Sequence, residues 1–126
     1  MPLTTGLITN TRDFGTAATN VVVNLVNENI TAGASVEVRI FYVLEPEVKI
    51  PLYVAGITLA ANSIARRLFF VSGVFAYEVQ FAITEPVAGE VVVSTFGLDA
   101  FGNLVQEQGI LHEEMHTITN LTPTGI

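Results

Sequence analysis

The chain has 126 residues, of which half are apolar and 13% are charged, and its formal net charge is −7 at pH 7. This composition is too apolar for a disordered chain, and the length suits one domain with a buried core. The acidic balance argues against nucleic acid or an anionic membrane surface as a partner, because binding to either depends on neutralising negative charge. Cysteine is absent, which excludes disulfides, thiolate catalysis and cysteine-ligated metal.

The chain divides by composition into three parts. Residues 1–19, rich in Thr, Ala and Asn, are predicted to form an N-terminal arm or first strand, with a short strand candidate at residues 7–9. Residues 20–119 are predicted to form a β-sandwich domain, and residues 120–126 an irregular C-terminal tail. Whether residues 1–19 pair within the chain or with a neighbouring copy is left open by the sequence.

Strand-like segments follow one another between turn residues. Pro51 places its segment at a sheet edge, and Gly56 favours a bulge or bend there. Residues 63–71 have no clean period, and although part of this segment could form one helical turn, the neighbouring strands favour a strand. The predicted strands are residues 20–27, 35–44, 50–59, 63–71, 74–84, 91–96, 104–106 and 110–119, with loops at residues 45–47 and 99–103.

The clearest strand runs from Val74 to Thr84, V-F-A-Y-E-V-Q-F-A-I-T. Aromatic and branched side chains alternate with small or polar ones, among them Glu78 and Gln80. A period of two predicts a strand with one face in the core and the other face in water. Pro86 ends this strand because proline cannot donate a hydrogen bond to a neighbouring strand.

Seven to nine short strands, separated by turn signals and without a convincing helix, predict an all-β fold. The spacing is typical of a single antiparallel β-sandwich, immunoglobulin-like or jelly-roll-like in layout.

The run S-G-V-F-A-Y-E-V-Q-F at residues 72–81 resembles the sixth strand of bacterial immunoglobulin-like and fibronectin-like β-sandwich domains. Tyr77, Val79 and Phe81 stand at the positions of that pattern. The resemblance implies a tyrosine corner, in which the Tyr77 hydroxyl bonds to the preceding turn. The tryptophan and the cysteines of antibody domains are absent, so the likeness is to the wider sandwich class.

A looser likeness is to small all-β subunits of spore surfaces, including endospore appendages. It implies production in the mother cell without a signal peptide, and the N-terminus M-P-L-T-T-G has neither a basic nor an apolar leader region. The absence of cysteine departs from appendage subunits, which are cross-linked through an N-terminal cysteine arm. A surface location without Sec export is therefore expected, with the cytoplasm as the alternative.

Residues 112–116 spell H-E-E-M-H, a literal H-E-x-x-H motif. On a helix its two histidines would share a face and bind zinc, with the glutamate as general base. The flanking residues favour a strand, on which His112 and His116 would lie roughly 13 Å apart, too far for one metal ion. The preferred interpretation places His112, Glu114 and His116 on a solvated strand face. The alternatives are a surface metal site, or a pH-sensitive contact between subunits, formed by these same three residues.

These patterns favour a non-enzymatic structural subunit that self-assembles into a homo-oligomer or filament on a spore, cell or virion surface. The contacts are expected between sandwiches, with exchange of the N-terminal strand as a further route. No cofactor, small-molecule ligand or membrane insertion is expected. The alternative is a monomeric module that binds a glycan or a protein. A metal-dependent hydrolase would require a helix at residues 110–118.

Overall fold

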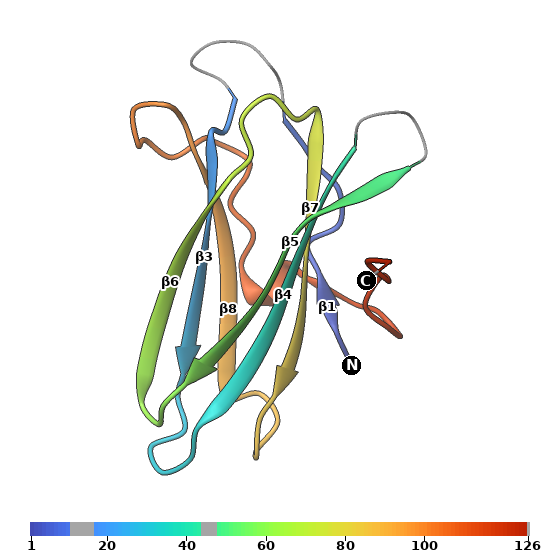
Figure 1. The fold of residues 1–126 in the computed structure, drawn as a ribbon. Helices are drawn as coiled ribbons and strands as arrows, with labels where there is room; N and C mark the ends of the chain where they lie inside the picture. The colour runs from blue at the N-terminus through green and yellow to red at the C-terminus, as the bar shows by residue number, and fades with distance from the viewer. Residues whose placement is uncertain (11–16, 44–47, 126) are drawn as a thin grey trace.

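Two antiparallel β-sheets face each other in the computed structural model, which describes residues 1–10, 17–43 and 48–125 (Figure 1). The described residues contain nine strands and one turn of 3-10 helix, which confirms the predicted all-β sandwich. The loop predicted at residues 45–47 and residues 11–16 of the predicted arm lie outside the described residues. The elements are β1 (Leu3–Thr4), β2 (Ile8–Thr9), β3 (Asn20–Asn27), β4 (Ala34–Val43), β5 (Lys49–Leu59), β6 (Ser63–Phe70), β7 (Ala76–Thr84), β8 (Val91–Leu98), η1 (His112–Glu114) and β9 (His116–Thr117).

The larger sheet has the strand order β5-β4-β7-β1-β9, and β2 also pairs with β7. The smaller sheet has the order β6-β3-β8. The edge position predicted for the strand that contains Pro51 is confirmed, because β5 ends the larger sheet. Of the bulge or bend predicted at Gly56, the bulge is wrong: Gly56 pairs in register with Glu37, and the irregularity falls where Ile40 pairs with Tyr53 but Phe41 pairs with Pro51.

The N-terminal residues join the larger sheet of their own chain. Leu3 pairs with Phe81 and Ile8 pairs with Tyr77, so β1 and β2 both lie along β7. β1 also pairs with β9 on its other side. Gly6 lies between the two short strands with φ of 71°, a left-handed conformation that costs glycine little.

The core lies between the sheets and follows the alternation of the long strands. Alternate residues of β3, β4, β7 and β8 point inward, because successive side chains of a strand point to opposite faces, and most of these inward residues are buried. The inward residues are Val21, Val23 and Leu25 of β3, Val36, Val38 and Ile40 of β4, Tyr77, Val79 and Phe81 of β7, and Val91 and Val93 of β8.

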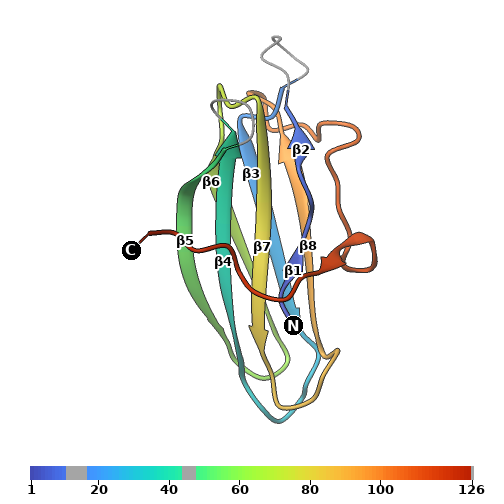
Figure 2. The ribbon, with the colours of Figure 1, turned by 90° about the vertical axis from the view of Figure 1, so that its right-hand side faces the viewer.

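The outer face of β7 does not face water as predicted. Glu78 is 9% exposed and Gln80 is 1% exposed. The C-terminal tail crosses the outer face of the larger sheet over β7, β4 and β5 (Figure 2). Gln80 and Thr122 exchange two hydrogen bonds of 2.8 Å, and Arg39 donates to the Thr122 carbonyl at 2.7 Å. The tail is therefore part of the fold.

The strands predicted at residues 104–106 and 110–119 are wrong. Residues 104–110 follow the free edge of β8 through two isolated bridges, Leu98 with Leu104 and Thr95 with Ile110. The chain then turns through η1, and only His116 and Thr117 form a strand. The predicted loop at residues 99–103 is confirmed, and the Asp99 carboxylate accepts hydrogen bonds from two of its backbone amides.

A buried side chain such as Val79 should contribute more to stability than an exposed apolar side chain. We expect Val79→Ala to lower the free energy of unfolding by about 2 kcal/mol, from the lost burial of two methyl groups and the cavity left behind. Val87→Ala is the matched control, since Val87 is 50% exposed and should change stability by less than about 0.5 kcal/mol. Urea unfolding followed by circular dichroism measures both, and equal losses in the two variants would contradict this core.

Candidate functional site

The H-E-x-x-H residues form neither a helical zinc site nor a strand face. His112–Glu114 is a single 3-10 turn, and His116 begins β9. The prediction that all three side chains point outward is wrong for His112, whose Nδ1 accepts a hydrogen bond of 3.1 Å from the Val93 amide of β8. Glu114 and His116 are exposed, and the Glu114 carboxylate accepts from the Leu111 amide at 2.8 Å. Within residues 1–10, 17–43 and 48–125, no three His, Cys, Asp or Glu side chains come close enough together to hold a metal ion.

An acidic side chain, Glu78, is buried on the outer face of β7. The Glu78 carboxylate accepts hydrogen bonds from the Thr4 hydroxyl, from Gln80 Nε2 at 3.0 Å and from Lys49 Nζ at 2.9 Å. Burial acts to raise the pKa of Glu78, but the hydrogen bonds from Gln80, Thr4 and Lys49 and the charge of Lys49 outweigh it and lower that pKa. Glu78 is thus held ionised with its acceptors occupied, and it joins β1, β5 and β7.

The lowered pKa of Glu78 makes stability depend on acid pH. The folded protein holds this proton more weakly than an unfolded chain with a carboxyl pKa of 4.5. The stabilisation is therefore complete above that value and is lost as the pH falls through the lower folded-state pKa. We expect Glu78→Gln to be less stable than the parent at neutral pH and to lose less of its unfolding free energy between neutral pH and about pH 3.

Urea unfolding at a series of pH values measures this effect. Glu113→Gln, which changes an exposed carboxylate, should keep the parent's dependence on pH. An unchanged acid limb in Glu78→Gln would show that other groups cause the loss of stability.

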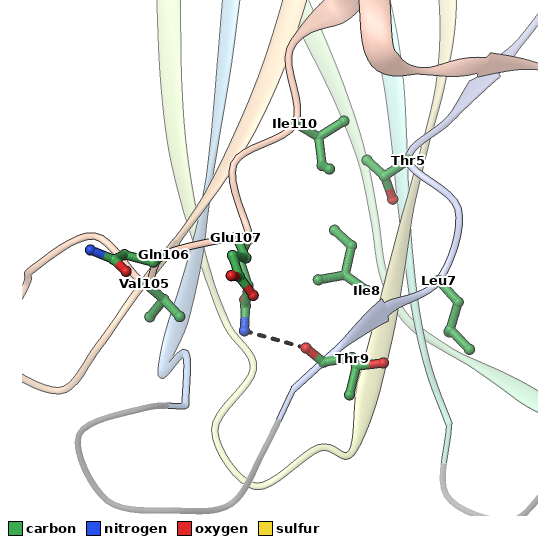
Figure 3. A pocket seen from close by; sticks show the side chains of 9 residues that line it. Thr5, Leu7, Ile8, Thr9, Val105, Gln106, Glu107 and Ile110 are labelled. Carbon is green, nitrogen blue, oxygen red and sulfur yellow. Dashed lines mark hydrogen bonds between the residues drawn. The ribbon is translucent and has the colours of Figure 1, made fainter.

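An open groove of about 410 Å³ lies where the two sheets part, between β2 and residues 105–110 (Figure 3). Leu7, Ile8 and Ile110 supply apolar side chains, and Thr5 and Thr9 supply hydroxyls. In the close-up, Thr5 and Ile8 lie across the opening from Glu107 and Ile110. The dashed line marks a hydrogen bond of 3.5 Å from the side-chain Nε2 of Gln108 to the Thr9 carbonyl.

A buried polar network lies beside this groove. The Tyr77 hydroxyl donates to Gln108 Oε1 at 2.7 Å, and Gln108 Nε2 donates to Asn10 Oδ1 at 3.0 Å. Asn10 Oδ1 also accepts from the Ala18 amide at 2.8 Å. The tyrosine corner implied by the resemblance is therefore not formed, because Tyr77 bonds to a residue 31 positions later in the chain. Burial raises the pKa of Tyr77 above its usual range.

Sequence reasoning missed Asn10 and Gln108, because single polar residues in irregular segments resemble ordinary loop positions. One indirect signal is Gly97 near the end of β8. A Cβ atom there would overlap Gln108 Oε1, so glycine leaves the space that the glutamine side chain occupies.

The outer face of the smaller sheet exposes apolar side chains. On β6, Ile64 is 76% exposed, Leu68 is 50% exposed and Phe70 is 59% exposed. They alternate with Ala65 and Phe69, which pack against the core. Neighbouring strands continue the apolar rows: Leu68 pairs with Val22, which pairs with Phe96, and Ile64 pairs with Val26, which pairs with Val92. Among the described strands β6 pairs only with β3, so its other edge is open.

Two arginines lie on β6: Arg66 shares the apolar face with Ile64 and Leu68, whereas Arg67 points to the opposite side of this edge strand. Arg66 and Arg67 are both exposed, and the side chain of Arg67 donates to the Arg66 carbonyl at 3.2 Å. The ion pairs in the described part of the chain join Arg39 to Glu37 and Lys49 to Glu78. Among residues 1–10, 17–43 and 48–125, neither Arg66 nor Arg67 forms an ion pair with a carboxylate, on a chain whose net charge is −7. We call Ile64, Arg66, Arg67, Leu68 and Phe70 the β6 surface.

Comparison with known proteins bears on the fold. No family model and no curated protein matches the chain. One solved structure, the crystal structure of Thermotoga maritima 1070, is similar with a TM-score of 0.51 and 10% sequence identity. The match covers 87% of this chain and 86% of that chain. At this identity the likeness supports the sandwich architecture alone.

The part of the chain that the structure describes contains no helix with the length and apolar character that crossing a membrane requires.

Proposed function

We propose that this protein is a non-enzymatic structural subunit that self-assembles on a spore, cell or virion surface. The observation that carries the proposal is the β6 surface, an apolar and basic patch beside an open strand edge. Several exposed apolar side chains grouped on one strand are typical of protein interfaces. An unpaired edge strand offers backbone groups to a second chain.

The N-terminal arm is a less direct route to assembly. β1 and β2 occupy positions along β7 in their own chain, so strand exchange would replace these contacts with the same contacts between two copies. Thr4, Ile8 and Asn10 are buried. Deleting residues 1–12 would therefore damage the fold as well as any exchange, and substitutions on the β6 surface are the sharper test.

Removing apolar area from the β6 surface should prevent assembly and leave the fold intact. We expect the parent to form particles or fibres that grow with concentration, and Leu68→Gln/Phe70→Gln to remain a monomer of 13.5 kDa under the same conditions. Light scattering after size exclusion, with negative-stain microscopy of the same fractions, measures this. The unfolding free energy should change by less than about 1 kcal/mol, since both side chains are exposed.

Val87→Gln is the matched control for this test, because it removes an exposed apolar side chain from the loop between β7 and β8. It should assemble as the parent does. A parent that stays monomeric at every concentration would overturn the structural-subunit proposal.

The groove between β2 and residues 105–110 favours a second candidate, a monomeric module that binds a glycan or a peptide. Its mixed apolar and polar lining suits a short extended chain. This reading predicts a monomeric parent that gives a reproducible hit on glycan or peptide arrays. Gln106→Ala/Glu107→Ala should weaken that hit at least about tenfold, whereas Leu68→Gln/Phe70→Gln should not. Arrays without a hit would contradict it.

A further inference from the structure

The smaller sheet has β6 at one edge and β8 at the opposite edge. Beyond β8 the chain follows the sheet edge through Leu104 and Ile110 and then turns through η1. β6 and this segment lie on opposite sides of the sandwich (Figure 2). We call residues 104–114 the acidic segment.

The acidic segment exposes both apolar and acidic side chains. Leu104 is 66% exposed and Leu111 is 54% exposed. Glu107, Glu113 and Glu114 are exposed as well, and the segment contains neither lysine nor arginine. It therefore matches the β6 surface in both respects, with leucines to meet leucine, isoleucine and phenylalanine, and carboxylates to meet two arginines.

Self-pairing of β6 across a two-fold axis is electrostatically unfavourable. Arg66 and Arg67 lie near the middle of Ser63–Phe70, so antiparallel pairing of two β6 strands in central register would set Arg66 of each strand opposite Arg67 of the other, with two guanidinium groups side by side on each face. Like charges directly opposite each other destabilise a strand pair. Ion pairs with carboxylates of a neighbour would remove this repulsion and give the arginines partners.

From this charge and surface complementarity, we propose that assembly is head to tail: the β6 surface of one copy docks on the acidic segment of the next. This inference rests on the proposed self-assembly and specifies its contact. Because each copy offers both surfaces on opposite sides, every docked copy leaves one of each free. Such a heterologous contact continues into a filament, or closes into a ring if the rotation allows.

A charge exchange tests the contact. One variant is Arg66→Glu/Arg67→Glu, which makes the β6 surface acidic. The other is Glu107→Lys/Glu113→Lys, which makes the acidic segment basic and retains Glu114 as the acceptor for the Leu111 amide. Each variant alone should need a concentration at least about tenfold higher than the parent for half-maximal assembly. An equimolar mixture should assemble at the parent's concentration, because each variant then offers the surface that the other lacks.

Two controls separate charge from folding. Circular dichroism and urea unfolding should show both variants folded. Glu28→Lys, on an exposed residue of the loop after β3, should assemble as the parent does, whereas single Glu113→Lys should not.

The possible results distinguish head-to-tail docking from self-assembly in general. A mixture that yields only dimers would place β6 against β6 and overturn head-to-tail docking. Impairment by the arginine variant alone, with Glu107→Lys/Glu113→Lys assembling normally, would keep self-assembly and reject the acidic segment as partner. Normal assembly of both variants would reject the contact altogether, and a monomeric parent would overturn self-assembly itself.

Discussion

β7 is the strand on which the rest of the structure depends, because it is buried on both faces and pairs along both edges. One edge pairs with β4, and the other pairs with β1 and β2. Its inward face carries Tyr77, Val79 and Phe81 into the core, and its outward face carries the buried Glu78 and Gln80, of which Gln80 bonds to the tail. Both chain ends are thereby attached to one strand, which makes them structural parts of the sandwich.

The burial of Glu78 is stable only because the surrounding elements supply donors. Removing a carboxylate from water is costly unless it is paired and hydrogen-bonded. Thr4 comes from β1, Lys49 from β5 and Gln80 from β7 itself, so three strands must be in place together. The network around Gln108 works in the same way with neutral groups, joining Asn10 before β3 to Tyr77 on β7.

The outer faces of the two sheets differ in how far other parts of the chain cover them. The larger sheet is covered by the tail, whereas the smaller sheet leaves the β6 surface exposed beside an unpaired edge. Natural sheets usually protect such edges with charge, bulges or a covering segment. Arg66 and Arg67 supply charge on β6, which disfavours pairing with an identical edge and favours an acidic surface instead. The asymmetry of the sandwich is thus the physical basis for both proposals.

Much of the fold follows from the sequence, because alternation of apolar residues is a local property that every strand carries. The boundaries of β3, the strand character of β6 and the edge position of β5 were predictable from this pattern and from Pro51. The same pattern misled where burial is not local. Glu78 and Gln80 look solvent-facing, and the residues that cover and bind them, Thr4 and Thr122, are distant in the chain.

The H-E-x-x-H motif, the groove and the β6 surface also depend on contacts that the local sequence pattern does not indicate. Strand-like composition around His112 favoured a strand, but bridging to β8 and a backbone hydrogen bond from Val93 determine a 3-10 turn. Nothing near Gln108 in the sequence indicates that it joins Tyr77 to Asn10. By itself the sequence determined the fold class and most strands, since both depend on residue type and spacing of two. The tertiary structure alone decided which faces are covered, which edge is open and which polar groups meet, because these depend on contacts between segments far apart in the chain.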